Sequence, residues 1–312
     1  MSSAPSSAPG SATITPSPPN RTSLATVAAQ TPRKNATIWS RFRHHKLAVI
    51  GLVVLIAMVV IAIFAPIFAP HAPNAVSLAN YRKPPSLDYL LGTDSQGRDV
   101  LSRLMFAARI SLSVGLVAVA IYVVIGTVLG GLAGFFGGWV DGIIMRLADM
   151  VLSFPSIIVI ITIVSILGPS ILNVMLVIGL LGWPPIARLV RGEFLTLRDR
   201  DFVVASRATG ARNGRIIFRH ILPNATTPVI VNATFGMAQA ILLEAGLSFL
   251  GLGVQPPTAS WGNMLNAAQS ITTLETMPWL WIPPGIAIVI AVLAINFVGD
   301  GLRDALDPRS GK

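Results

Sequence analysis

The 312-residue chain contains no cysteine, which excludes disulfide bonds and thiolate metal sites. Charged side chains are scarce as well: they make up 12% of the residues, about half the share that soluble domains carry. Only four histidines are present, and the adjacent pair His44 and His45 has neither a supporting carboxylate nor a third ligand. These absences predict that the chain itself binds no metal and no cofactor.

The sequence also lacks a phosphate-binding loop of the form GxxxxGK[ST], so we expect no ATP hydrolysis and no enzyme activity from this chain. What it has instead is apolar surface, since 53% of the residues are hydrophobic. A bilayer suits this composition, and about 20 apolar residues are needed for each helix that crosses it. The net charge of +10 is interpreted as the usual excess of Lys and Arg in cytoplasmic loops, not as a nucleic-acid surface.

Long uncharged runs predict six transmembrane helices and therefore an all-α membrane protein. One run holds two antiparallel spans, because Gly168, Pro169 and Ser170 interrupt it. The expected spans are residues 47–69, 110–135, two helices within 150–187, 224–247 and 279–298.

Positive residues predict the orientation of these spans. If the N-terminus is cytoplasmic, 18 of the 23 Lys and Arg residues lie on the cytoplasmic side, where helical membrane proteins concentrate them. Both termini are therefore expected in the cytoplasm. Residues 1–38 are dominated by Ser, Ala, Pro and Thr, which predicts a disordered cytoplasmic tail.

The longest cytoplasmic loop, between the fourth and fifth spans, is predicted to be a structured protrusion. We expect a short helix at 202–210, with Asp201 as its N-cap and Gly210 in the left-handed position at its end. A second short helix at 213–220 is expected to stop ahead of Pro223, since proline disfavours helix at the residue before it.

The segment VASRATGARNGRIIFRHILP of this loop resembles the EAA loop of binding-protein-dependent ABC importers. That loop has an alanine-containing helix, a glycine, nine residues, an apolar position, any residue and then Leu-Pro. The matching positions are Ala205, Gly210, Leu222 and Pro223. The departures are Val204 at the glutamate position, Ser206 at the second alanine and His220 at the apolar position. The resemblance is therefore good in spacing and partial in chemistry.

Four other segments resemble the C-type permease subunit of dipeptide and oligopeptide ABC importers. They are residues 91–112, 134–156, 244–265 and 300–309. The resemblance implies the type I ABC importer permease fold. It divides the chain, after the tail, into an N-terminal transmembrane helix and extracytoplasmic loop (39–108), a five-helix permease domain (109–303) with its coupling loop (188–223), and a cytoplasmic C-terminal tail (304–312).

The same resemblance implies partners and a location. A C-type permease forms a heterodimer with a homologous second permease and works with two cytoplasmic ATPase subunits, which use ATP and Mg²⁺, and with an extracytoplasmic substrate-binding protein. It is a multi-pass protein in the lipid bilayer of a prokaryotic inner membrane. Import of di- or oligopeptides is therefore expected. The alternatives are glutathione or nickel complexes within this family, and a proton-coupled secondary carrier outside it.

In this family the coupling helix, here residues 202–213, docks on an ATPase subunit. Arg207 and Arg212 have two interpretations: they pair with acidic residues of the ATPase, or they belong to the cytoplasmic charge bias and contact lipid headgroups. The expected coupling residues are Ala205, Arg207, Gly210, Arg212, Leu222 and Pro223.

Two features lie within the predicted spans. Gly126, Gly130 and Gly134 recur at every fourth position, which predicts close helix packing or, alternatively, a surface that slides during transport. Glu244 is an ionisable residue in or at the outer end of the fifth span. It is expected either to face the substrate pathway and attract the amine of a peptide, or to be a hydrogen-bonded structural carboxylate.

The outer loop before the second span carries charges of both signs. Asp94 is expected to cap a helix that starts near Ser95. Arg98 and Arg103 are expected either to meet the binding protein or to form ion pairs on an amphipathic surface helix.

Overall fold

The structure, a computed structural model, describes residues 38–306, and these residues form helices and loops without a β-strand. The predicted disordered tail at 1–38 thus lies outside the described residues, except for Ile38, as do residues 307–312 of the C-terminal tail. The α-helices are α2 (Ile38–His44), α3 (Lys46–Ile63), α4 (Ala65–Phe68), α5 (Val100–Phe136), α6 (Gly138–Leu152), α7 (Ser156–Leu167), α8 (Ile171–Leu181), α9 (Trp183–Arg198), α10 (Asp201–Ala208), α11 (Asn213–Ile216), α12 (Leu222–Phe249), α13 (Trp261–Asn266), α14 (Ile271–Thr276) and α15 (Ile282–Leu306). The shorter elements are the 3₁₀ helices η1 (Leu78–Asn80) and η3 (Pro278–Leu280) and the π-helical turn η2 (Ile217–Ile221).

Within residues 38–306, five helical segments are long and apolar enough to cross a bilayer, and one bent helix pair is a sixth candidate. The five segments are Lys46–Ile63, Val100–Phe136, Ile171–Arg198, Asn213–Phe249 and Pro278–Leu306. The bent pair is α6 with α7, whose axes differ by 82°. An all-α membrane protein is confirmed, and each predicted span has a counterpart.

The third predicted span is a bent pair and not a straight helix after Asp149. Helix α6 already begins at Gly138, and Pro155 stands in the break before α7. Proline removes a backbone donor and restricts the residue ahead of it, so the chain turns at this point. The predicted turn between the third and fourth spans is confirmed, because α7 ends at Gly168 with a φ of 89°.

Helix α5 starts at Val100, ten residues earlier than expected. Asp99 is its N-cap and accepts a hydrogen bond from the backbone N–H of Ser102 at 2.9 Å. Arg103 does not end the helix: its side chain is buried, and its guanidinium donates hydrogen bonds to the Pro73 carbonyl and to the side-chain oxygen of Asn74. With 37 residues the helix is about 55 Å long, so it extends beyond the ~30 Å apolar core of a bilayer.

Helix α9 also continues past the expected end of its span. Arg188 and Arg191, which the sequence places in the cytoplasmic loop, lie within the helix and bind carboxylates of α6. Arg188 pairs with Asp149 at 2.6 Å, and Arg191 makes two bonds of 2.5 Å to Asp141. These ion pairs hold the charged end of α9 in helical form, so the structured loop begins only after Arg198.

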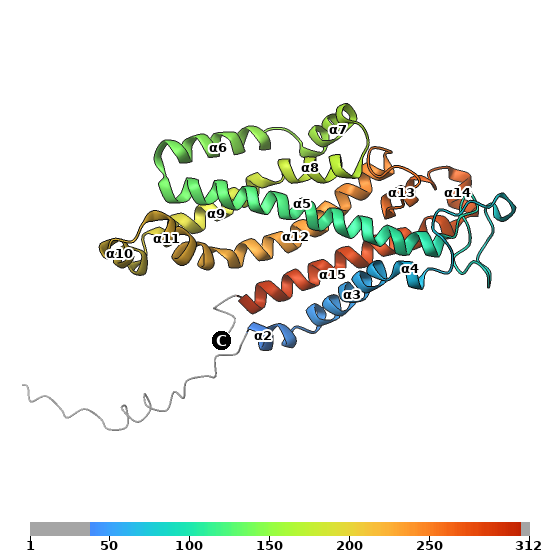
Figure 1. The fold of residues 1–312 in the computed structure, drawn as a ribbon, viewed down its shortest axis with the longest axis horizontal. Helices are drawn as coiled ribbons and strands as arrows, with labels where there is room; N and C mark the ends of the chain where they lie inside the picture. The colour runs from blue at the N-terminus through green and yellow to red at the C-terminus, as the bar shows by residue number, and fades with distance from the viewer. Residues whose placement is uncertain (1–37, 307–312) are drawn as a thin grey trace, which may run out of the picture. The chain divides into compact units, whose positions relative to one another are not determined.

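The long helices pack around α5, α12 and α15. Helix α12 lies between α5 and α15, α9 packs on α5, and α3 packs on α15 (Figure 1). The short helices α10 and α11 lie at one end of these long helices, and α13 and α14 lie at the opposite end (Figure 1). Two sets of loop residues are therefore kept on opposite sides of the membrane.

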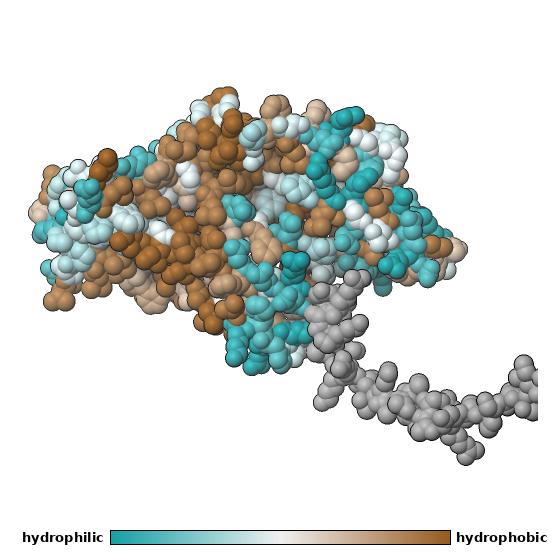
Figure 2. All heavy atoms as spheres, turned by 180° about the vertical axis from the view of Figure 1, so that it is seen from behind, coloured by the Kyte–Doolittle hydropathy of each residue, from teal (hydrophilic) through white to brown (hydrophobic). Residues whose placement is uncertain are grey.

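The surface matches a bilayer environment. Figure 2 shows hydrophobic residues covering the middle of one face, with hydrophilic residues gathered toward its ends. On α3, the side chains of Ile50, Val53 and Ile56 are each more than half exposed. Aliphatic side chains at this exposure suit lipid tails, which are as apolar as they are.

A stripe of three glycines brings α5 and α9 together. Its members are Gly126, Gly130 and Gly134, and all three are buried. A Cβ atom added at Gly126 would lie 2.6 Å from the Cβ atom of Ile186, and one added at Gly134 would lie 2.6 Å from that of Phe194. This geometry is the one expected of close helix packing. Sliding of the same surface during a conformational change stays a prediction.

We predict that Gly130→Ala destabilises the protein by about 1–3 kcal/mol, as overpacking does. The added methyl group would overlap the carbonyl oxygen of Ala187 and lie 2.9 Å from the Cβ atom of Val190, and the backbone of α9 cannot move aside without disturbing the ion pairs to α6. Gly142→Ala on α6 is the matched control, since nothing lies within 4 Å of its added Cβ. Thermal unfolding in detergent should show a lower midpoint for the first variant alone; equal midpoints would contradict the packing assignment.

Candidate functional site

The α10–α11 segment (residues 201–216) is a helix, a glycine turn and a second helical turn. Helix α10 ends in the double hydrogen bond of a Schellman motif: the Gly210 N–H donates to the Arg207 carbonyl at 2.9 Å, and the Ala211 N–H donates to the Ser206 carbonyl at 3.1 Å. Gly210 has a φ of 80°, which confirms its predicted left-handed position. At the other end the N-cap is Arg200, and Asp201 is the first residue of the helix.

The second short helix does not stop ahead of Pro223, and that expectation is wrong. Helix α11 passes through the π-helical turn η2 directly into α12, where Pro223 lies in the first turn. A proline ring clashes with the carbonyl four residues earlier in a regular α-helix. The wider turn of η2 relieves this clash, because its hydrogen bonds join residues five apart. Residues 213–249 are therefore one continuous helical segment.

The α10–α11 segment has one buried face and one exposed face. Val203 and Ile216 are fully buried and belong to the main hydrophobic core. Phe202 and Val204 of α10 are 42% and 53% exposed, and Phe218, just beyond the segment in η2, is 72% exposed. Large apolar side chains that are exposed at a polar end of a membrane protein indicate a surface that another protein covers.

The expected coupling residues occupy different parts of this region. Ala205, Arg207, Gly210 and Arg212 are exposed, as is Pro223 at the start of α12. Leu222 is half-buried and packs against the main core. The segment thus exposes four of these residues, whereas Leu222, the first residue of α12, packs against the core.

The arginines near the segment fall into two groups. Those closest to the helical core are bound within the chain: Arg198 donates to the Gly134 carbonyl at 3.2 Å, and the Arg207 guanidinium lies 5.6 Å from the ring centroid of Phe135. For the side chains of Arg212, Arg215 and Arg219, no ion-pair partner lies within residues 38–306. Arg212 therefore has a free guanidinium on the exposed face, whereas Arg207 is directed toward the end of α5.

Sequence reasoning missed the ion pairs between α6 and α9. Asp141 and Asp149 lie on one helix, and their partners Arg191 and Arg188 lie about 40 to 50 residues away along the chain. The sequence signal that could have indicated these pairs is the eight-residue spacing of Asp141 and Asp149, which puts both carboxylates on the same side of a helix. These pairs attach α9, and with it the start of the α10–α11 segment, to α6.

Glu244 is fully buried at the opposite end of α12. Its carboxylate accepts hydrogen bonds from the hydroxyls of Ser111 on α5, at 3.0 Å, and Ser248 on α12, at 2.7 Å. Both hydroxyls also accept backbone N–H groups, from Trp261 of α13 and from Val254. The carboxylate thus joins α5, α12 and the segment that leads into α13, as the structural interpretation requires. Contact with a substrate stays a prediction.

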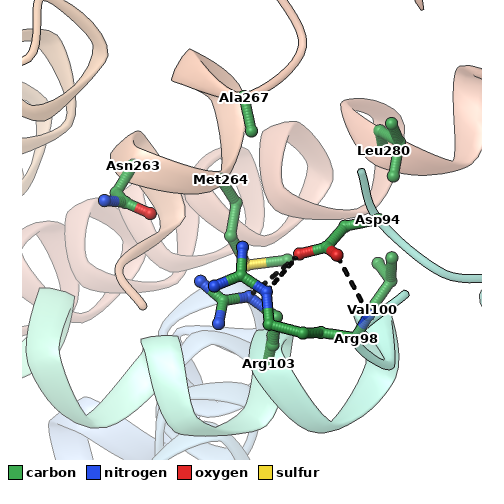
Figure 3. A pocket seen from close by; sticks show the side chains of 8 residues that line it. All are labelled: Asp94, Arg98, Val100, Arg103, Asn263, Met264, Ala267 and Leu280. Atoms are coloured by element: carbon green, nitrogen blue, oxygen red, sulfur yellow. Dashed lines mark hydrogen bonds and ion pairs between the residues drawn. The ribbon is translucent and has the colours of Figure 1, made fainter. Parts of the chain in front are cut away.

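The charged residues before α5 form a buried cluster. Figure 3 shows the Asp94 carboxylate facing the guanidinium groups of Arg98, at 2.7 Å, and Arg103, at 3.7 Å, beside a cavity of about 30 Å³. All three residues are less than 10% exposed, so the expectation of a surface helix with its own ion pairs is wrong. The Asp94 carboxylate accepts hydrogen bonds from the backbone N–H groups of Gln96 and Arg98. Asp94 is therefore not the expected helix cap; Asp99 is the N-cap of α5. The cluster holds the outer loop against α13, since Asn263 and Met264 line the same cavity.

Comparison with known proteins matches two families to this chain. The family described as binding-protein-dependent transport system inner membrane component matches residues 126–312. The N-terminal transmembrane domain of oligopeptide transport permease C matches residues 35–85. Together the matches cover both the first span and the helices that carry the α10–α11 segment.

Individual relatives cover most of the chain. A candidate peptide permease protein of Brucella suis biovar 1 is 48% identical over 87% of this chain and 90% of its own length. A dipeptide transport system permease protein of Alkalihalophilus pseudofirmus is 42% identical over 95% and 96% of the two chains. Among solved structures, the MetNI methionine ABC transporter in an inward-facing conformation has a TM-score of 0.53 at 21% identity, covering 66% of this chain and 98% of that one. The last likeness concerns the fold alone.

We predict that Glu244→Leu lowers the thermal unfolding midpoint much more than Glu244→Gln. Leucine leaves the Ser111 and Ser248 hydroxyls without their buried acceptor, at a cost of about 1–3 kcal/mol for each unpaired group. Glutamine keeps a carbonyl oxygen and the shape of the side chain. If instead both variants unfold like the wild type while transport kinetics change, the substrate-contact interpretation of Glu244 would replace the structural one.

Proposed function

This chain belongs to the family of binding-protein-dependent transport system inner membrane components, and we propose that it is one permease half of an ATP-driven importer of di- or oligopeptides. As a family member it is a multi-pass permease of the bacterial inner membrane. The observation that carries the proposal is the set of exposed apolar side chains on α10 and η2, which lie in the arginine-rich part of the chain and are therefore assigned to the cytoplasmic side. An importer permease without ATPase chemistry of its own needs such a surface.

In the proposed mechanism, the exposed face docks into a cleft of a cytoplasmic ATPase subunit. Two rigid connections carry the resulting motion into the membrane. On one side, α9 is held to α5 by the glycine stripe and to α6 by the ion pairs of Arg188 and Arg191. On the other side, η2 continues into α12 without a flexible linker. Movement of the segment then tilts two spanning helices together, a rigid-body change between inward-open and outward-open states.

The docking contact combines shape and charge. Phe202, Val204 and Phe218 supply apolar area, and Arg212 supplies a cation for an acidic residue of the ATPase. Val204 stands where the related loops carry a glutamate, so this contact relies more on apolar surface than on a polar bond. Arg207 contributes by fixing the end of α10 against Phe135.

The proposed assembly contains this chain, a homologous second permease, two ATPase subunits that use ATP and Mg²⁺, and an extracytoplasmic binding protein. The peptide substrate is supported by the names of the relatives, two of which are described as peptide or dipeptide permeases. Family membership argues against the proton-coupled carrier. Glutathione and nickel complexes remain competing substrates for the experiment.

We expect proteoliposomes that contain the complete complex, with the cognate binding protein outside and ATP inside, to accumulate labelled di- and tripeptides. Accumulation should require ATP and should persist when a protonophore is added, since the energy comes from the ATPase subunits. Glutathione and a nickel chelate are tested in parallel. Uptake of either of these without uptake of peptides would overturn the peptide assignment but leave the importer assignment intact.

Gly210→Pro should abolish the stimulation of ATP hydrolysis by loaded binding protein while the chain still inserts in the membrane. Proline requires a φ near −65°, whereas Gly210 has a φ of 80°, so the Schellman turn and the position of α10 are lost. Gly214→Ala is the control, because nothing lies within 4 Å of its added Cβ and its φ is not positive. Normal stimulation of ATP hydrolysis in the proline variant would refute the docking assignment.

A further inference from the structure

A second cavity, of about 150 Å³, lies where four helical elements meet within the membrane-spanning part of the chain. It is bordered by α5, by the start of α7, by the junction of α8 and α9, and by α12. Its polar side chains are Tyr122, Ser156 and Gln239, and the rest of its lining is aliphatic or glycine. Charged side chains of residues 38–306 do not take part in the lining, so a ligand in this cavity meets hydroxyl and amide groups.

Tyr122 is the residue that distinguishes this cavity from a packing defect. Its side chain is only 7% exposed, and its hydroxyl has no hydrogen-bond partner among the described residues, yet it borders the cavity. The hydroxyl is not one of the fully enclosed polar atoms, so it is open to the cavity, where a hydrogen-bonding group can reach it. The hydroxyl is therefore placed to bind a group that enters the cavity.

Two glycines from different helical segments pack against the side chain of this tyrosine. A Cβ atom added at Gly236 of α12 would overlap the Tyr122 hydroxyl oxygen, and one added at Gly182 would lie 2.8 Å from the ring. Any other residue at Gly236 would displace the hydroxyl. The position of the oxygen is thus set by the backbones of two spanning helices and does not depend on a flexible rotamer.

The start of α7 supplies a second group of donors at the same cavity. Ser156 is the first residue of this 12-residue helix, and the N-cap Pro155 offers no side-chain hydrogen bond. Its carbonyl accepts the N–H groups of Ile158 and Val159, so those of Ser156 and Ile157 are the ones without a partner among the described residues. Uncapped N–H groups and the positive end of the helix dipole favour an anion. A carboxylate is the anionic group that hydroxyls and helix N–H groups bind without a charged side chain.

Two of the polar residues that line the cavity can be reached from outside the chain. Ser156 and Gln239 are both exposed in the isolated chain, although each lies on a span. Polar side chains at such positions face protein or a water-filled path and not lipid. In a two-permease assembly that path is the route of the substrate.

We propose that this cavity receives the terminal carboxylate of the transported peptide, with the Tyr122 hydroxyl and the first turn of α7 as its donors. The proposal rests on peptide import as the function of the complex. The aliphatic lining, which includes Ile160 and Leu243, accommodates the side chain of the terminal residue. Uncharged donors hold the carboxylate weakly enough for release, as a transport site requires.

The test uses the assembled complex of both permeases and the ATPase subunits. The binding protein is left out so that the selectivity of the binding protein does not affect the result. Binding of radiolabelled trialanine is measured at equilibrium, and unlabelled trialanine and trialanine amide are compared as competitors. We expect the amide to compete about tenfold more weakly than the free acid. Tyr122→Phe should weaken binding of the acid several-fold and binding of the amide less, so the discrimination between them becomes smaller.

Tyr81→Phe is the matched control, because it removes the same hydroxyl from an exposed tyrosine of the outer loop and should bind like the wild type. Ser156→Ala should weaken binding of the acid less than Tyr122→Phe, since the N–H groups remain. Tyr122→Phe keeps the ring between Gly182 and Gly236, so its thermal unfolding midpoint should match that of the wild type.

Two results would overturn the carboxylate site: unchanged discrimination in Tyr122→Phe, or no binding of trialanine by a wild-type complex that does import it. Import is measured on the same preparation after the binding protein is added. A wild-type complex that imports no trialanine would instead refute the proposed peptide function, so the two failures are distinguishable.

Discussion

Helices α5 and α9 approach so closely that three positions of α5 have no room for a side chain. Lipid tails are as apolar as leucine, so helices in a bilayer associate through such van der Waals contact and through buried polar pairs. Here both act on α9, which is bound to α5 by the glycine stripe and to α6 by two ion pairs. Since α10 begins three residues after α9 ends, the position of the α10–α11 segment, the proposed docking surface, depends on this contact.

Three carboxylates within or beside the helical core have polar partners in the chain. Asp141 binds Arg191, Asp94 binds Arg98, and Glu244 binds two serines, so each of these carboxylates joins elements or turns and stabilises the assembly. Ionisable groups within a membrane are expensive, and pairing is the means of retaining them. The Tyr122 hydroxyl differs, because its environment is shaped for it by two glycines but provides no partner within the described residues.

Local signals in the sequence were sufficient for features that depend on local chemistry. The apolar runs locate the spans, and the left-handed turn at Gly210 follows from the preference of glycine for positive φ. The errors concern interactions between distant segments. The charges of Arg188 and Arg191 predict that they belong to a cytoplasmic loop, but their carboxylate partners on α6 hold them in helix α9. Pro223 has the pattern of a helix end, but the π-helical turn before it lets the helix continue.

The sequence alone determined which segments enter the bilayer, which side faces the cytoplasm and which family the cytoplasmic loop resembles, because hydrophobicity, charge bias and turn preference act over a few residues. Only the tertiary structure decided where polar side chains are satisfied and where they are not. Glu244 is the clearest case: its sequence position suits either a substrate pathway or a structural bond, and the hydrogen bonds that the structural bond requires come from serines 133 residues before it and four after it. Burial and partnership arise when separate helices meet, and no local pattern encodes that geometry.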